Sequence, residues 1–194
     1  MNTGENIKNA GLVLLKTYES IYRMMEQCRN IASKAGYEKV SDKFLRWKTD
    51  GDPNGWLISS FIILFQKQTD EDLGHGWRNG PVFAAEINIL DCDNPQRLPE
   101  LRLSRFDYAS LNDWDGISPA DYWGFHQPVD ESFARDFIRE ESDWYAISKP
   151  RSEKVASAYW DLVQVVTTKT PLTEVTSDNL NEKVFGAFDR LSEI

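Results

Sequence analysis

The most apolar run of the chain is Trp56–Phe65, which directly follows a turn-like Asp-Pro-Asn-Gly sequence at residues 52–55. Alternate positions of this run are largely apolar on both sides, a pattern typical of a strand that is covered on both faces. In such a strand, Ser59 and Ser60 point to opposite faces. We therefore predict a central strand around which the rest of the chain packs.

Residues from about Glu5 to Ala35 have the strongest helical pattern, and Gly36 follows as the expected stop. Apolar side chains recur every three or four residues, in the order Ile7, Leu14, Tyr18, Ile21, Met25, Cys28 and Ala32. This spacing suits either a coiled-coil dimer or a long helix packed on a sheet. Further apolar positions widen the surface beyond one seam and favour the packed helix: Leu12, Val13, Leu15, Tyr22, Met24 and Ile31. A homodimer through this helix is the alternative.

Two further strands are predicted over Val82–Leu90 and Glu100–Tyr108. In the first, apolar residues alternate with a mixed face that carries Glu86 and Asn88. The loop before Val82 is too short to hold a clear crossover helix, so we expect antiparallel pairing with the Trp56–Phe65 strand.

The rest of the chain gives weaker patterns. We predict a short helix over about 39–47, an irregular stretch at 109–129 with a short strand or packed loop at 122–125, a helix over about 130–141, a short strand at 144–147, and helices over about 152–167 and 178–192. The sequence as a whole predicts one compact α+β domain over residues 1–194. A mostly antiparallel sheet of about four or five strands would be covered by the long N-terminal helix, a candidate appendage, and by C-terminal helices.

The net charge of −9 is unevenly distributed along the chain. Residues 1–50 hold nine Lys and Arg against six Asp and Glu, whereas residues 51–194 hold thirteen against twenty-five. Nucleic acids and anionic membranes are bound by clustered cations, so the acidic body argues against both as direct partners. It favours a basic protein partner instead.

Cysteine usage and the absence of targeting signals indicate a compartment. Cys28 and Cys92 are the two cysteines, and their spacing does not suggest a disulfide framework. The N-terminus lacks the charged and apolar regions of a signal peptide, and no apolar run reaches the roughly 18 residues of a membrane span. We therefore expect a cytoplasmic protein.

The common catalytic and cofactor motifs are missing from the sequence. It contains no G-x-x-x-x-G-K-[ST], G-x-G-x-x-G, H-E-x-x-H, C-x-x-C or G-x-S-x-G. We therefore predict no cofactor and no metal of the usual kinds. His75 and His126 are the two histidines. Either could act as a general base, but neither has a nucleophile close in sequence, which favours a surface or packing role.

Glu86 is the most interesting single carboxylate, because it lies in the middle of a predicted strand. Together with Asp91, Asp93 and Asp107 it could hold Mg²⁺ or Mn²⁺ through oxygen ligands, as a hydrolase or nuclease would require. Asn88 stands where restriction-type nucleases have a lysine. The alternative is a structural carboxylate that is either solvated or paired with an arginine of the neighbouring strand, Arg102 or Arg105.

An aromatic-rich stretch is the best candidate binding surface. Its residues are Tyr108, Trp114, Tyr122, Trp123 and Phe125, together with Trp144 further along the chain. Trp and Tyr combine a large apolar area with one polar group and often anchor interfaces. Residues 106–134 contain no Lys or Arg. Because binding of nucleic acid requires cations beside the stacking rings, an exposed part of this stretch would meet protein rather than nucleic acid.

The sequence alone does not fix a function. We expect a non-catalytic binding or regulatory protein that acts through protein–protein contact, for example as an acidic inhibitor or a complex subunit. The alternative is a Mg²⁺- or Mn²⁺-dependent hydrolase or nuclease that uses the carboxylates around Glu86.

Overall fold

The structure, a computed structural model, describes residues 2–41, 43–46, 48, 51, 53–91 and 94–194. Its main element is a seven-stranded sheet in the order β1-β2-β5-β6-β9-β8-β7, in which every neighbouring pair is antiparallel. The strands are β1 (Tyr37–Lys39), β2 (Ser60–Lys67), β5 (Val82–Asn88), β6 (Glu100–Tyr108), β7 (Phe137–Glu141), β8 (Ala146–Pro150) and β9 (Leu162–Pro171). The short strands β3 (Glu71–Asp72) and β4 (Arg78–Asn79) form a separate hairpin. The fold is α+β, with more strands than expected.

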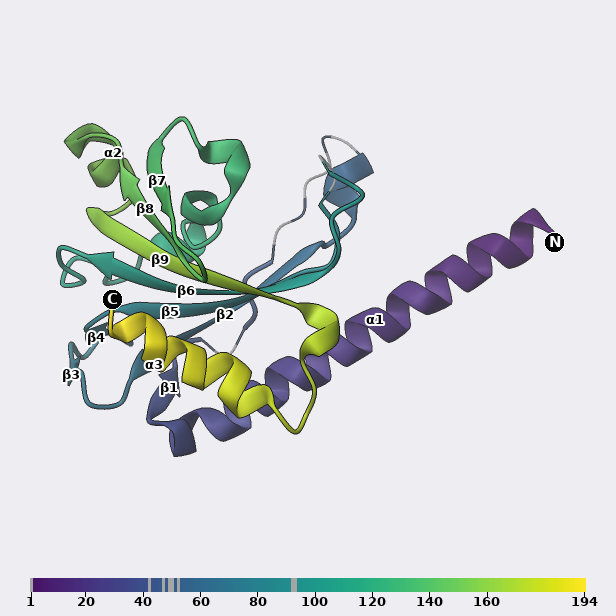
Figure 1. Cartoon of the computed structure of the whole chain (residues 1–194), viewed down its shortest axis with the longest axis horizontal. Helices are drawn as coiled ribbons and strands as arrows, with labels where there is room; N and C mark the ends of the chain where they lie inside the picture. The colour runs from purple at the N-terminus through teal and green to yellow at the C-terminus, as the bar shows by residue number, and fades with distance from the viewer. Residues whose placement is uncertain (1, 42, 47, 49–50, 52, 92–93) are drawn as a thin grey trace.

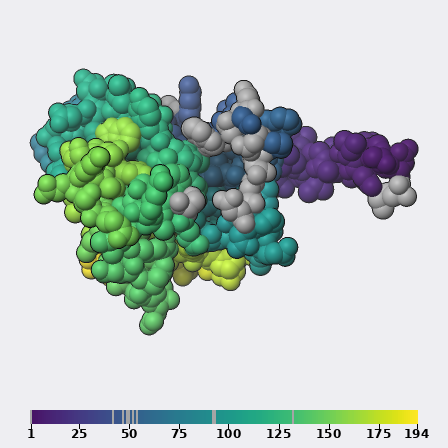
Figure 2. Space-filling model, turned by 90° about the horizontal axis from the view of Figure 1, so that it is seen from above, coloured from purple at the N-terminus to yellow at the C-terminus, as the bar shows by residue number. Residues whose placement is uncertain are grey.

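The long N-terminal helix is confirmed as α1 (Thr3–Ala32), which a 3₁₀ turn extends over Ser33–Ala35. Asn2 caps its first turn, and Gly36, with φ of +83°, ends it in the left-handed conformation that favours glycine. The C-terminal half of α1 lies against the sheet, whereas the N-terminal half runs away from the rest of the molecule (Figures 1 and 2).

The other helical segments are short. They are α2 (Glu153–Ala158), a π-helical stretch at Glu182–Gly186 that continues into α3 (Ala187–Ser192), and 3₁₀ turns at Pro53–Trp56, Pro119–Asp121, Gln127–Val129, Glu131–Phe133 and Leu172–Glu174. Within the described part of the chain, none of the helices combines the length and the apolar character that crossing a bilayer requires.

One face of the sheet is covered by the C-terminal half of α1 and by α3. This face is packed with apolar side chains, many of them aromatic. The Tyr37 ring contacts the rings of Phe83, Phe185 and Phe188. Phe188 also contacts Phe65 and Phe83, and Phe65 contacts Phe185. The Tyr37 hydroxyl donates to Asp189 Oδ1 at 2.8 Å and so connects β1 to α3. We call this the helix face.

The opposite face is covered by the loop that runs from residue 109 to residue 133. Its apolar cluster includes Ile62, Trp77, Phe106, Trp114 and Phe125. The irregular pattern predicted for residues 109–129 is confirmed, because this stretch contains turns and short 3₁₀ segments but no strand. We call this the loop face.

The Trp56–Phe65 prediction is correct in type and wrong in extent. The strand begins at Ser60, whereas Trp56 lies in a 3₁₀ turn and is 68% exposed. Both faces of β2 are buried, as its two-sided apolar pattern predicted. β2 is second from the edge of the sheet, however, and β6 is the middle strand.

Three helix predictions are wrong. Among the described residues of 39–47, the chain runs along β2, with Val40 and Leu45 bonded to its backbone. Within 130–141, residues 137–141 form β7 instead of a helix.

The third wrong prediction is the helix over 152–167. It starts at the predicted Ser152 cap but ends at Ala158, and β9 begins at Leu162. Trp160 and Asp161 have φ of 58° and 57°, which breaks the helix, and the β-branched residues that follow suit a strand. The apolar spacing of three and four residues was therefore misleading here.

The two edges of the sheet differ in construction. The edge strand β1 is only three residues long. The other edge strand, β7, displays a run of charged residues, Arg139, Glu140 and Glu141.

Candidate functional site

A charged row crosses the loop face from strand to strand. Glu86 on β5 pairs in register with Arg102 on β6, which pairs with Lys169 on β9. Glu86 is 2% exposed and Arg102 is 3% exposed. Charged groups this deeply buried require partners, because desolvation is otherwise too costly.

Glu86 has three such partners. Its Oε1 accepts a hydrogen bond from Ser60 Oγ at 2.5 Å and contacts His126 Nδ1 at 2.5 Å. Its Oε2 accepts from Arg102 Nη1 at 3.1 Å, as predicted for one of the two candidate arginines. A second nitrogen of Arg102 donates to Glu100 at 3.1 Å. Ser60 thus points to the loop face to meet Glu86.

His126 connects this row to the covering loop. Its Nε2 lies 3.0 Å from Asp130 Oδ2, so the ring bridges two carboxylates, and the Trp123 ring lies 4.8 Å from it. His126 was expected at the surface or in packing, and its largely buried ring fits the packing role. We call Ser60, Glu86, Arg102, His126 and Asp130 the charge network.

The charge network shifts the pKa of its members. Burial alone would raise the pKa of Glu86, but the charges of His126 and Arg102, with their hydrogen bonds, lower it to about 2. Burial alone would lower the pKa of His126, but the charge of Glu86 and the hydrogen bonds to Asp130 and Glu86 raise it to about 9. At neutral pH, therefore, Glu86 is a carboxylate and His126 is an imidazolium.

This arrangement is better suited to holding the covering loop on the sheet than to catalysis. An imidazolium whose two nitrogens both face carboxylates has no free position to accept a proton from a substrate. Ser60 donates to Glu86 and not to His126, so no hydroxyl is activated by the ring. The charge network holds the loop around residues 123–130 against the sheet.

The other predicted carboxylates do not join Glu86. Asp107 lies on the helix face, where Arg105 and Gln164 both donate to it at 2.8 Å. Asp91 accepts from the backbone of Asn94 at 3.0 Å, and Asp93 lies outside the described residues, as does Cys92. Among the residues that the structure does describe, no group of three or more His, Cys, Asp or Glu could hold a metal ion. Catalysis by these carboxylates stays a prediction.

The predicted aromatic surface divides into buried and exposed members. Trp114 and Phe125 are almost fully buried and contact Tyr108, so they belong to the core of the loop face. Tyr122 and Trp144 are 57% and 45% exposed. Trp123 is half-buried beside His126. Trp77, which the sequence did not single out, completes the buried cluster against Trp114.

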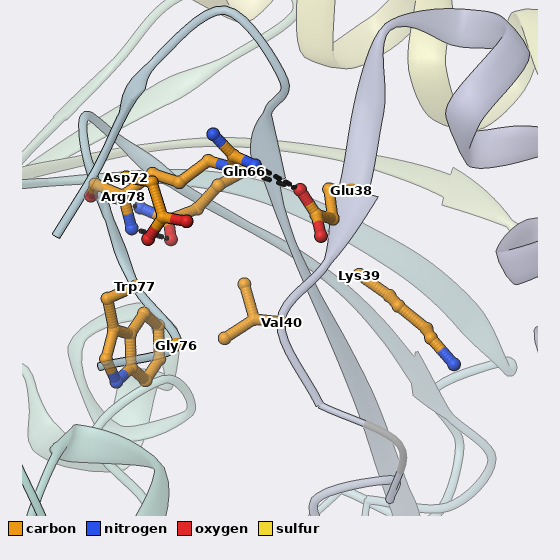
Figure 3. Close-up of a pocket in the computed structure, with 8 residues that line it drawn as sticks. All are labelled: Glu38, Lys39, Val40, Gln66, Asp72, Gly76, Trp77 and Arg78. Atoms are coloured by element: carbon orange, nitrogen blue, oxygen red, sulfur yellow. Dashed lines mark hydrogen bonds and ion pairs between the residues drawn. The ribbon is translucent and has the colours of Figure 1, made fainter. Parts of the chain in front are cut away.

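A small pocket lies between β1 and the β3–β4 hairpin (Figure 3). The amide of Gln66 both donates to and accepts from the backbone of Arg78 at 2.8 Å, and the Arg78 guanidinium reaches Glu38 at 2.6 Å. These polar groups satisfy one another, and the pocket volume is only about 80 Å³. The contacts explain how the hairpin is held and do not indicate a ligand.

The N-terminal part of α1 is exposed on all sides. Residues 3–13 are all exposed, and Ile7 and Val13 are 70% and 68% exposed. Figure 2 shows this segment standing clear of the body. Residues 3–13 are called the projecting segment from here on.

A groove of about 390 Å³ lies beside the packed part of α1, between that helix and residues 172–180. Its walls are mainly apolar, with Ile21, Met24, Ile87, Leu172, Val175 and Leu180 contributing. Sequence reasoning did not find this groove, because it depends on how the C-terminal segment folds back beside α1.

In comparisons with known proteins, the chain matches no protein-family model, no curated protein and no solved structure.

Proposed function

We propose that the protein is a non-catalytic binding or regulatory protein that acts through protein–protein contact, with the projecting segment as the contacting element. The observation that carries this proposal is the exposure of Ile7, Leu12, Val13 and Leu15 on a helix that leaves the body. Exposed apolar side chains that gather on one element are typical of interaction sites.

The projecting segment also has a poor intrinsic tendency to form a helix. It contains Gly4 and Gly11, each of which costs roughly 1 kcal/mol relative to alanine in a helix interior, and Asn6 and Asn9, which are also weak helix formers. The segment propagates from the packed part of α1, but its residues are all exposed, so packing on the body does not offset these weak helix formers. A partner that packs on the projecting segment would supply that stabilisation.

The acidic character of the body supports a basic partner surface. Residues 51–194 carry an excess of twelve acidic groups, and exposed carboxylates repel other acidic proteins while speeding encounter with basic ones. An acidic inhibitor or a complex subunit fits this charge.

The proposal is tested by affinity capture from an extract of the source cells. The full chain is compared with an Ile7→Asp/Val13→Asp variant and with Ile117→Asp, which alters an apolar residue of similar exposure on the body. We expect a stoichiometric protein, either another chain or a second copy, that the native chain and Ile117→Asp retain and the double variant loses. Equal recovery by all three chains would overturn the proposal.

A further inference from the structure

Two cations lie directly opposite each other on the loop face. Arg102 on β6 and Lys169 on β9 are partners in the antiparallel register, so their side chains leave the same face of the sheet. Like charges in directly opposed positions of a sheet are destabilising. Arg102 is paired with the buried carboxylates Glu86 and Glu100. In the part of the chain that the structure describes, neither carboxylate forms an ion pair with Lys169.

Two further arginines approach the Lys169 ammonium. Arg97 comes from the connection between β5 and β6, and Arg139 comes from β7. Burial lowers the pKa of Lys169, against the attraction of Glu100. The charges of three neighbouring arginines lower this pKa further, those of Arg102, Arg97 and Arg139. Four cations therefore converge at one place in a body that is acidic as a whole.

The counter-charge that reaches Lys169 is loosely placed. Glu131 lies on a 3₁₀ turn of the covering loop, and its Oε1 is 3.7 Å from Lys169 Nζ and 3.6 Å from Arg97 Nη2. Both distances exceed the roughly 2.7–3.2 Å of an N–H···O hydrogen bond. The Glu131 side chain is 68% exposed, so water competes with both contacts. One exposed carboxylate thus faces two cations without a hydrogen bond to either.

Buried donors beside these cations also lack partners. Arg102 uses Nη1 for Glu86 and Nη2 for Glu100, but its Nε has no hydrogen-bond partner among the described atoms. The same holds for Nδ2 of Asn88, which lies directly opposite Glu100 in the register of β5 and β6. A buried donor without an acceptor costs stability. The surroundings of Lys169 therefore lack negative charge and hydrogen-bond acceptors, and an anion supplies both.

We propose that Arg97 and Lys169 bind the phosphate group of a small molecule at the position that Glu131 occupies, with Arg102 and Arg139 adding to the positive potential. A phosphate monoester carries close to two negative charges at neutral pH, which matches two cations better than one carboxylate does. The planar guanidinium of Arg97 suits phosphate oxygens, and the Lys169 ammonium acts as a point charge. Because Glu131 is exposed, its carboxylate can leave without breaking the buried ion pairs.

The shape of the cluster favours a small molecule over a polynucleotide. Nucleic acids are bound by cations that neutralise several successive phosphates. Here the cations gather at one point, and carboxylates surround them, namely Glu86, Glu100, Asp130, Glu131 and Glu141. These carboxylates would repel further phosphates. The site includes no residue of the projecting segment, so it is independent of the partner contact proposed above.

Calorimetric titration of the full chain tests the site, in a phosphate-free buffer of low ionic strength. The probes are inorganic phosphate and phenyl phosphate, a simple monoester. We expect one phosphate group bound per chain, and Lys169→Met should weaken binding at least about tenfold, because charge-assisted hydrogen bonds are lost. Lys154→Met removes an exposed lysine of α2 and is the matched control, with unchanged affinity. Tighter binding of phenyl phosphate identifies an organic monoester as the ligand, and equal or weaker binding identifies free phosphate.

Glu131→Gln tests the position of the bound group. It removes the carboxylate that competes with the ligand, so the affinity for phosphate should rise about two- to fivefold. Arg97→Met removes the second cation and should weaken binding as Lys169→Met does. The Ile7→Asp/Val13→Asp variant should bind phosphate like the native chain, because neither residue belongs to the site.

The thermal midpoint without ligand separates binding from support of the fold. Lys169→Met removes a like charge opposite Arg102, so its midpoint should equal or exceed that of the native chain. A midpoint lowered more than by Lys154→Met would assign Lys169 to support of the fold and overturn the inference. Phosphate affinity that is unchanged in Lys169→Met, or no binding by either the native chain or Glu131→Gln, would overturn it as well.

Discussion

The two faces of the sheet are closed by different forces. On the helix face, α1 and α3 bury aromatic and aliphatic side chains against β2, β5 and β6. On the loop face, an irregular segment covers the sheet, and Glu86, Arg102 and His126 hold it there through buried ionic contacts. Packing of apolar groups does not depend on protonation, whereas the contacts of the loop face require Glu86 and His126 in fixed charge states. The helix face should therefore be stable over a wide pH range and the loop face over a narrower one.

The largest expected effect is that of Arg102→Met. The substitution leaves Glu86 and Glu100 without the guanidinium that joins them. Removing one partner of a buried ion pair typically costs about 3–5 kcal/mol, so the free energy of unfolding should fall by about that amount in denaturant titrations. Arg135→Met is the control, because Arg135 is 85% exposed and its loss should change stability by less than about 0.5 kcal/mol. An equal effect of the two substitutions would contradict an ionic origin for the closure of the loop face.

The pH dependence of unfolding comes next in size. The pKa of His126 is raised from 6.5 to about 9, so its contribution to stability is complete below pH 6.5 and is lost as pH rises through 9. The pKa of Glu86 is lowered from 4.5 to about 2, so its contribution is complete above pH 4.5 and is lost as pH falls toward 2. Stability should therefore be greatest between about pH 4.5 and 6.5 and should fall by roughly 1–3 kcal/mol by pH 9.

His126→Gln is the matched variant for this profile. It removes the group that titrates on the alkaline side, so the decline between pH 6.5 and 9 should flatten, while part of the acid decline from Glu86 remains. An unchanged alkaline slope in His126→Gln would show that another group controls it.

The smallest expected changes in stability come from Ile→Val substitutions at two neighbouring residues of β2. Ile63 packs on the helix face and Ile62 on the loop face, and both are almost fully buried. Ile→Val at either position should cost about 0.5–1.5 kcal/mol through the lost methylene group. For Ile63→Val this cost should be the same at pH 6 and pH 9, whereas for Ile62→Val it should shrink at pH 9 as the loop loosens. A pH-dependent cost at Ile63 would mean that the two faces are not independent.

Local patterns predicted much of the fold. The α1 helix, its stop at Gly36 and the strand β6 were predicted nearly to the residue, because long periodicity and alternation are strong local signals. The strands β7 and β9 were predicted as helices. Phe133, Phe137 and Ile138 fit a helical spacing around β7, and the apolar residues from Val155 to Val166 fit one around β9. Both strands are instead set by pairing, of β7 with β8 and of β9 mainly with β6. Such contacts between separate segments are not contained in local periodicity.

The candidate sites were predictable to a smaller degree. A carboxylate in a buried strand needs a partner, and that argument led to Arg102 or Arg105 on the neighbouring strand, of which the structure pairs Arg102 with Glu86. The contact of Glu86 with His126 joins residues 40 positions apart through an irregular loop, and no local signal marks it. The groove beside α1 depends likewise on where residues 172–180 return to the helix. The projecting segment carried a signal that was not used, namely two glycines within an otherwise strong helical pattern.

The construction of the sheet edges sets a limit on how large an assembly of this chain can become. Open-ended stacking requires a free strand that accepts another, and here one edge offers only the three residues of β1 while the other displays the charges of β7. Growth by strand addition is therefore blocked at both ends of the sheet. Association is left to surfaces away from the sheet edges, such as the projecting segment. Raising the concentration should therefore not produce a continuous series of larger particles joined strand to strand.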